Sequence, residues 1–410
     1  MDNFTEKIAT DRTYSDEDLL LLKKWEKYYP EIMQNLTEAE KEDILNEHKK
    51  SGAYFMEYHV FDFAHLSDEE RAEYVVSKTA IRYLRRMALS EEKRLALKDK
   101  YACWQKLPEF YKRDICPPLD REAFIEFAGK HTAFIAKPID GTGGHGVRFV
   151  NLKRRKITPE EYYDKYLSKR GYIVEELITQ DPEMARFHPE SVNTVRPVTF
   201  CKDGEVTILF AIMRMGCGST KVDNTSSGGL CVAVDPENGR IVSGAVHRTD
   251  STLLPAHPDS GIIFEGTQIP RWDELKELVT AAALKLADPP IVGWDLALSD
   301  KGWVIVELNW QPSFRSYQML TRKGLRSRLE SVTGVDFLPR QEKKKTKEKT
   351  KKRTGKKIET RPEAEARPKL NTEKKADQRK AAQKKTEKKK VNKVHRLLRS
   401  IRKKLKTIRQ

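Results

Sequence analysis

A glycine-rich stretch behind a lysine is the part of this sequence best suited to binding phosphate. Lys137 is followed by Gly141, Thr142, Gly143, Gly144, His145 and Gly146. Glycines lack Cβ atoms, so backbone N–H groups can approach phosphate oxygens closely. Three of the glycines match G-x-G-x-x-G, but the dinucleotide fingerprint needs a helix after the loop, whereas residues 147–150 predict a strand. The loop also lacks the Lys-Ser or Lys-Thr pair of a P-loop.

A strand–loop–strand hairpin can instead fold over a triphosphate. The loop would cover the phosphates, and Lys137, on the strand that enters the loop, would reach them from below. The alternative is a flexible glycine-rich hairpin that holds a lysine by chance. A second motif is needed to decide between these interpretations.

Residues 291–310 provide that second motif, because they predict an apolar hairpin interrupted by oxygen ligands. We predict a three-residue turn at Asp300-Lys301-Gly302, with Gly in the left-handed position. This register pairs Ser299 with Trp303 and therefore places Asp295 opposite Glu307.

Asn309 follows Glu307 by two residues and shares its strand face. Carboxylate and amide oxygens are hard ligands that suit Mg²⁺, which bridges nucleotide phosphates and relieves repulsion between close carboxylates. Asp295, Glu307 and Asn309 are therefore the predicted metal ligands. The alternative is an edge hairpin with a polar outer face, which the surrounding apolar residues disfavour.

The predicted elements around these motifs give a mixed α+β chain. Residues 1–115 are predicted to be mainly helical, and Ser15, Thr37 and Ser67 each stand three residues before an acidic residue, which is the capping-box spacing. From residue 134 onward, short apolar runs between turn residues predict strands. These strands cover 134–137, 147–150, 172–175, 194–201, 205–213, 291–298 and 303–308. A helix is predicted at 272–286.

The positive charge of the chain is concentrated at one end. The whole sequence has 78 basic and 61 acidic residues, a net charge of +17. Residues 341–410 hold 30 of the basic and eight of the acidic residues, so residues 1–340 are slightly acidic. The body is long enough to bury a sizeable core. The low-complexity tail is predicted to be disordered over 341–390.

Residues 391–410 combine apolar residues at three- and four-residue steps with many basic ones, which predicts a short amphipathic helix. Such helices bind anionic membranes. A solvated tail, and a tail that binds nucleic acid or anionic glycan, are the alternatives.

Cysteine usage and the absence of a long apolar run predict a cytoplasmic protein. The five cysteines have no metal-site or C-x-x-C spacing, so reduced thiols are expected. No run of about 18 apolar residues occurs, and the N-terminus lacks a signal-peptide core. With the basic tail, this predicts an enzyme in the cytoplasm, peripheral at the inner membrane surface.

The order of the motifs resembles that of ATP-grasp enzymes. A lysine-and-glycine hairpin, a glutamate pair at a strand end and a D…E-x-N hairpin follow one another. The sequence is similar to the glutamate-ligase-like branch, and most similar to the sugar-transfer-associated ATP-grasp family, over roughly residues 55–335. The resemblance implies a two-lobed ATP-grasp domain at 116–340, with an ATP lobe at about 116–180 and a metal and substrate lobe at about 181–340.

The resemblance also implies roles for individual residues. Lys137 and the glycine loop would bind phosphates, Arg214 would stabilise the transferred phosphoryl group, and the D…E-x-N residues would hold Mg²⁺. The nucleotide would further contact a segment between the lobes and the start of the next strand. These contacts are Glu175, Glu176, Leu177, Ile178, Asn193 and Arg196. A solvated strand end and a surface arginine are the alternatives for the glutamate pair and Arg214.

Three further segments are identified by the resemblance or by turn chemistry. Residues 223–224 and 228–229 resemble the substrate-side loop, and His257 is either a structural histidine or a substrate contact. Lys202-Asp203-Gly204-Glu205 predicts a two-residue hairpin turn, which would place Asn193 opposite Arg214. Residues 310–312, Trp-Gln-Pro, depart from the family pattern and leave the shape of the acceptor pocket open.

The implied activity is that of an ATP-dependent carboxylate–amine ligase that uses ATP and Mg²⁺ and forms an acyl phosphate. Its substrates would be small-molecule or glycan-precursor acids and amines, in polysaccharide assembly. A kinase that phosphorylates a small molecule or sugar, and a polyanion-binding protein without catalysis, are the alternatives. No specific nucleic acid is predicted as a partner.

Overall fold

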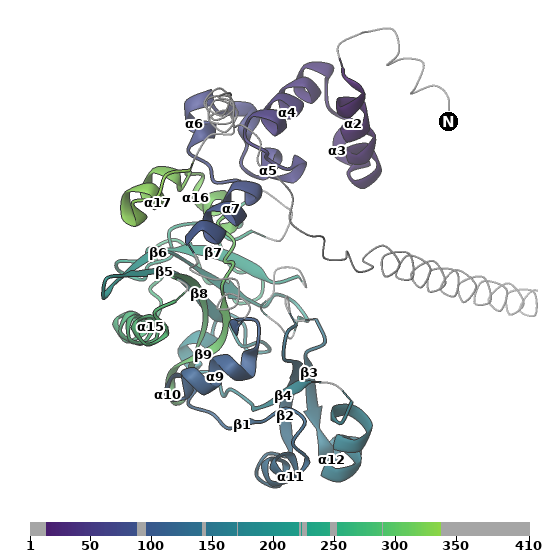
Figure 1. Cartoon of the computed structure of the whole chain (residues 1–410), viewed down its shortest axis with the longest axis vertical. Helices are drawn as coiled ribbons and strands as arrows, with labels where there is room; N and C mark the ends of the chain where they lie inside the picture. The colour runs from purple at the N-terminus through teal and green to yellow at the C-terminus, as the bar shows by residue number, and fades with distance from the viewer. Residues whose placement is uncertain are drawn as a thin grey trace, which may run out of the picture. The chain divides into compact units, whose positions relative to one another are not determined.

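The computed structural model describes residues 14–87, 96–141, 145–169, 171–220, 223, 228–246, 252–288 and 290–337 (Figure 1). The predictions for Thr142, Gly143, Gly144, Asn224 and the 341–410 tail lie outside these residues. Within the described ranges, no helix is both long and apolar enough to cross a membrane.

The N-terminal part is helical, as predicted. Its elements are α2 (Asp16–Tyr28), α3 (Pro30–Met33), α4 (Glu38–Lys50), α5 (Phe55–Val60), η1 (Phe63–His65), α6 (Asp68–Ala72), α7 (Ser77–Met87), α9 (Lys100–Lys106) and α10 (Pro108–Tyr111). The three predicted capping boxes are present at Ser15, Thr37 and Ser67, each with reciprocal hydrogen bonds to the acidic residue three positions on. These caps satisfy N–H groups that the first helical turn leaves unpaired.

The remaining elements form two antiparallel sheets and the helices around them. The strands are β1 (Ile115–Cys116), β2 (Ala133–Pro138), β3 (Arg148–Asn151), β4 (Tyr172–Glu176), β5 (Thr194–Lys202), β6 (Glu205–Met215), β7 (Leu230–Val234), β8 (Ile291–Ser299) and β9 (Gly302–Asn309). The helices are α11 (Arg121–Lys130), α12 (Leu152–Arg155), α13 (Pro159–Tyr162), η2 (Tyr163–Leu167), α14 (Pro182–Ala185), α15 (Trp272–Leu286), α16 (Arg315–Thr321) and α17 (Arg326–Thr333). The α+β class is confirmed, and α15 has its predicted bounds.

The small sheet has the strand order β1-β4-β2-β3 and carries Lys137 on a central strand. Phe134 and Ala136 of β2 pack against α11 and α13 in one buried cluster. Because side chains alternate along a strand, Ile135 and Lys137 point to the opposite face. The strand β1 was not predicted, since two residues give no periodic signal.

The large sheet has the order β7-β6-β5-β8-β9. Asp203 and Gly204 form the predicted two-residue turn between β5 and β6, with φ angles of 52° and 83°. The predicted register is wrong by one residue beyond a bulge at Val198/Thr199, and Arg214 therefore lies opposite Thr194 rather than Asn193. The strand β7, which pairs with β6 through Arg214 and Cys231, was missed.

A bulge also decides the register of the β8–β9 hairpin. Gly302 has the predicted positive φ of 86°, but Ser299 pairs with Gly302 rather than with Trp303. A register shift after Asp295 adds one residue to β9, so that Asp295 lies opposite Glu307 as predicted. The turn was predicted one residue out of register, and the bulge compensates for it.

Both faces of the large sheet are covered. On one face, α15 packs Leu275 and Val279 into a cluster that includes Val195 and Met213. On the other face, residues of α7 and α17 share a buried cluster with residues of β5 and β6 (Figure 1). Helices α2, α4 and α5 add a third cluster, which reaches Ile212 of β6. Arg196, Arg214, Asp295 and Glu307 lie on strands of this sheet.

Candidate active site

Charged side chains on and beside the two sheets include three ion-pair groups that contain the predicted site residues. They are Arg113–Glu175–Lys137, Lys100–Glu307 and Arg196–Asp295–Arg214–Asp223. Five cations face four carboxylates, which leaves one positive charge in surplus. Buried charges of this density are costly unless they are paired or serve a ligand.

Lys137 lies at the centre of the first group. Its side chain is only 7% exposed, and its Nζ is 2.6 Å from Oε1 of Glu175. Burial lowers the pKa of the Lys137 ammonium, and the Glu175 carboxylate opposes that effect. For Glu175, burial alone would raise the pKa, but Lys137 and Arg113 outweigh it and lower the pKa. The Glu175 carboxylate is therefore held ionised between the Lys137 and Arg113 cations.

Asp295 is the centre of the third group. Both of its oxygens are bound by arginines: Arg196 forms a bidentate pair, and Nη2 of Arg214 lies 3.0 Å from Oδ2. Burial would raise the pKa of the Asp295 carboxyl, but the two guanidinium groups lower it to about 2. The aspartate is therefore ionised at any physiological pH.

Arg214 connects the β8–β9 hairpin to the predicted substrate-side loop. We call this hairpin the metal hairpin, because it carries the three predicted metal ligands. Its Nη2 donates to Oγ1 of Thr194 at 2.9 Å and lies 3.2 Å from Oδ2 of Asp223. Thr194 in turn donates to Asp223. Burial lowers the pKa of Arg214, but the Asp223 and Asp295 carboxylates outweigh this and raise it. Arg214 is thus a fixed cation between two acids.

Lys100 is a site residue that sequence reasoning missed. From the first turn of α9 its ammonium reaches Oε1 of Glu307 at 3.2 Å and donates to the backbone oxygen of Gly141. It therefore connects a predicted metal ligand to the start of the phosphate loop. The sequence signal was weak, because Lys100 is one of many lysines in a helical segment and only Asp99, the helix cap, marks the turn.

The predicted metal ligands form a donor set that fits a hard divalent cation. Asp295 and Glu307 are register partners, and Nδ2 of Asn309 lies 3.4 Å from Oδ2 of Asp295. All three offer side-chain oxygens, the ligand type of Mg²⁺. Arginines and Lys100 balance the two carboxylates in this structure, so an ion would replace part of that pairing.

An exposed aromatic residue lies on the same face of the small sheet as Lys137. Phe149 of β3 is register partner to Ile135 and therefore shares the sheet face of Lys137. Its side chain is 56% exposed, whereas Val150 behind it is fully buried. An exposed aromatic face on the side of Lys137 would suit a purine base. From the sequence, residues 147–150 were predicted only as the strand that follows the glycine loop.

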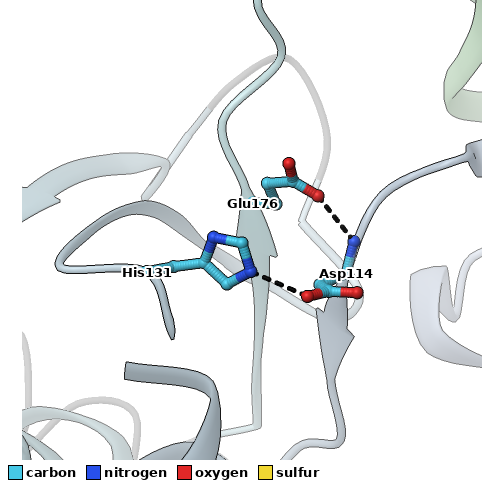
Figure 2. Close-up of side chains that lie close together, drawn as sticks. All are labelled: Asp114, His131 and Glu176. Atoms are coloured by element: carbon cyan, nitrogen blue, oxygen red, sulfur yellow. Dashed lines mark hydrogen bonds and ion pairs between the residues drawn. The ribbon is translucent and has the colours of Figure 1, made fainter. Parts of the chain in front are cut away.

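Glu176 lies beside Asp114 and His131 (Figure 2), which is a different environment from that of Glu175. It accepts the backbone N–H of Asp114 at 2.9 Å and pairs with Lys301 at 3.0 Å, while His131 bonds Asp114 at 2.7 Å. Ligand atoms of Asp114, His131 and Glu176 lie within 4.8 Å of one another, which is compatible with a metal ion. The contacts already explain the cluster, since they join β1, β4 and the end of α11.

The other predicted nucleotide contacts differ in what they touch. Asn193 is fully buried, and its Nδ2 donates to the backbone oxygens of Met184 and His188. Leu177 and Ile178 follow β4 as half-buried residues without regular structure. Gly146 has a φ of 81°, which the loop needs to enter β3. Gly141 and His145 border the undescribed part of the loop.

His257 is buried and uses both ring nitrogens within the protein. Nε2 lies 2.9 Å from the backbone oxygen of Gly216. Since a carbonyl oxygen can only accept a hydrogen bond, Nε2 is the donor of this pair. Nδ1 accepts the backbone N–H of Asp259 at 3.2 Å. On the other side of Gly216, Ser191 accepts its backbone N–H at 3.1 Å. His257 therefore supports the loop two residues beyond Arg214, which favours the structural interpretation of this histidine.

Gly216→Ala is expected to destabilise the protein by about 1–3 kcal/mol, because overpacking of a buried site costs that much. A Cβ at this position would lie 2.4 Å from Nδ1 of His188 and 2.6 Å from Oγ of Ser191. Urea unfolding measures the change. Gly129→Ala is the matched control, since no atom lies within 4 Å of its Cβ position in α11 and a helical alanine stabilises. Equal effects would contradict the packing argument.

Comparison with known proteins gives the family of this chain. The model of the family described as sugar-transfer associated ATP-grasp matches residues 88–334, more than half of the chain. No curated protein matches. Among solved structures, the chain is similar to the ATP-grasp ligase PsnB complexed with a phosphomimetic variant of minimal precursor, Mg and ADP. The identity is 18% over 56% of this chain and 54% of that chain, with a TM-score of 0.33.

Two further solved structures show similar partial likeness. N5-carboxyaminoimidazole synthase from Aspergillus clavatus has 11% identity over 62% of this chain and 58% of that chain, with a TM-score of 0.37. Biotin carboxylase from Campylobacter jejuni has 12% identity over 61% and 46%, with a TM-score of 0.38. The chain thus spans about half the length of these structures. On the family match, the chain belongs to the sugar-transfer associated ATP-grasp family, and its two sheets form the α+β fold that the resemblance implied.

Proposed function

We propose that this protein is an ATP-dependent carboxylate–amine ligase. The observation that supports the proposal most is that Lys100 pairs with Glu307 and Arg214 pairs with Asp295 on one hairpin, while Lys137 donates to the backbone oxygen of Val306 beside them. This arrangement provides cations for phosphate oxygens beside oxygen ligands for a metal. Family membership supports ATP as the nucleotide.

The chain's own residues would bind and orient the nucleotide. Lys137 and Lys100 offer ammonium groups to the phosphates, and Phe149 offers an apolar face to the base. Arg214, held between Asp223 and Asp295, can stabilise charge on the phosphoryl group during transfer. Phosphoryl transfer depends mainly on such positioning and electrostatic stabilisation, so no covalent protein nucleophile is required.

Mg²⁺ would be held by Asp295, Glu307 and Asn309, and when bound it neutralises charge on the phosphate oxygens. The arginines around Asp295 keep that carboxylate ionised and ready to act as a ligand. Lys100 can leave Glu307 for a phosphate oxygen, since its ammonium also contacts the start of the glycine loop.

The proposed reaction has two balanced steps. A carboxylate oxygen of the substrate attacks the γ-phosphorus, the bond from that phosphorus to ADP breaks, and an acyl phosphate forms. The amine nitrogen then attacks the acyl carbon, phosphate leaves, and the nitrogen loses one proton. The surplus positive charge among the described ion pairs suits an anionic acid. A glycan-precursor acid and an amino sugar are the proposed substrate pair.

A substrate panel tests the proposal. Purified protein with ATP and Mg²⁺ is incubated with paired acids and amines, including uronic acids and amino sugars, and products are identified by mass. The expected result is ADP and phosphate formed together with an amide that lacks one water relative to its precursors. A stable phosphorylated product without the amine adduct would instead indicate a kinase. ATP turnover absent from every pair would contradict the ligase proposal.

A further inference from the structure

Arg113 is a buried cation that neither the motifs nor the proposed reaction account for. Its side chain is 3% exposed and donates to Oε2 of Glu175 through Nη2 at 2.6 Å and through Nε at 3.1 Å. Its Nη1 donates to the backbone oxygen of Ile305 at 2.6 Å and to that of Tyr111 at 3.2 Å. One guanidinium thus connects the small sheet to β9 of the large sheet.

The acceptor on β9 lies at the bulge that sets the register of the metal hairpin. Ile305 pairs with Leu296 and Glu307 pairs with Asp295, which leaves Val306 without a register partner. Arg113 binds the oxygen of Ile305, and Lys137 binds that of Val306 at 3.3 Å. The bulge therefore presents two consecutive carbonyl groups to two cations, next to Glu307.

The charge of this buried group also depends on Arg113. Glu175 has two cationic partners, Lys137 at 2.6 Å and Arg113 at 2.6 Å, so the three side chains carry a net charge of +1. Without Arg113, Glu175 would neutralise Lys137 completely. Because charges interact strongly at low dielectric, the loss of this positive charge would weaken the binding of a phosphate at Lys137.

We propose that Arg113 is a positioning residue for nucleotide binding: by sharing Glu175 with Lys137, it keeps a positive charge available for a phosphate, and it holds Lys137 beside the bulge of the metal hairpin. The inference rests on the proposed function, in which Lys137 contacts phosphate. Arg113 itself contacts the protein only. Glu175 is then the residue whose negative charge is divided between Lys137 and Arg113.

Calorimetric binding of Mg-AMPPNP to four variants tests the idea. Arg113→Met is expected to weaken binding about tenfold or more, corresponding to the loss of one buried charge from the group. Arg113→Met combined with Glu175→Gln restores a net charge of +1 and is expected to recover most of that loss. Glu175→Gln alone should bind no more weakly than the parent, and Arg113→Lys should bind more tightly than Arg113→Met.

Matched controls separate this from damage to the fold. Arg121→Met removes another arginine of the small lobe, whose partner Asp164 is exposed, and should leave binding unchanged. Thermal unfolding shows which variants are folded. If Arg113→Met does not fold, the double variant and Arg113→Lys carry the test, since both keep the net charge of +1 and should bind within a few fold of the parent. No recovery in the double variant, or weaker binding in Glu175→Gln, would overturn the proposal. Failure of Lys137→Ala to weaken binding would instead overturn the proposed function.

Discussion

Lys137→Ala is expected to lower kcat/KM for ATP by about 10²–10³-fold, the usual consequence of removing one fixed donor to developing phosphate charge. The ammonium is buried and held between Glu175 and the oxygen of Val306. It has already lost its hydration in the folded protein, so little reorganisation is needed when phosphate arrives. Steady-state ATP turnover with the best acid and amine pair measures the effect.

The fold should survive this substitution. Alanine leaves Glu175 paired with Arg113, so the carboxylate keeps a cation and no acid is left unpartnered. Circular dichroism and thermal unfolding check this expectation. Lys130→Ala is the control, because Lys130 lies in the same lobe but is exposed, and its ion pair among the described residues is with Glu126. Near-parent turnover in the Lys137 variant would remove this lysine from the active site.

Residues that carry chemistry could be predicted where their spacing was local. The Asp295, Glu307 and Asn309 set follows from strand alternation and one turn, although the turn was placed one residue out of register. That error was cancelled by the bulge at Val306, which no sequence pattern indicated. The same type of error was not cancelled at Arg214, where a bulge moved its partner from Asn193 to Thr194.

The missed residues come from outside the motifs. Lys100 and Arg113 lie in a segment that reads as helix and connector, and each reaches a carboxylate that is distant in sequence. Their roles depend on how two sheets pack, which periodicity does not specify. Glu175 was predicted as a nucleotide contact from the resemblance, and the fold shows that its carboxylate is buried between two cations. Pairing between residues that are distant in sequence thus brings further charged side chains to the predicted motifs.

The two acids of the metal hairpin are expected to respond differently to neutral substitution. Asp295→Asn should lower the free energy of unfolding by about 3–5 kcal/mol, because it leaves two largely buried arginines without their shared carboxylate. Glu307→Gln should change stability by no more than about 1 kcal/mol, since the Glu307 side chain is 28% exposed and Lys100 retains the oxygen of Gly141. Both variants should need more Mg²⁺ for half-maximal ATP turnover.

The pH dependence of unfolding distinguishes the cause of the Asp295 effect. Its pKa is lowered from 3.8 to about 2 in the folded protein, so its ionised form contributes stability that is complete above about pH 4 and is lost as the pH falls through about 2. The difference in unfolding free energy between parent and Asp295→Asn should therefore narrow from pH 5 towards pH 2. Urea unfolding across that range measures it. A difference that stays constant would mean that asparagine disturbs packing instead, and an unchanged Mg²⁺ requirement in Glu307→Gln would exclude this residue as a metal ligand.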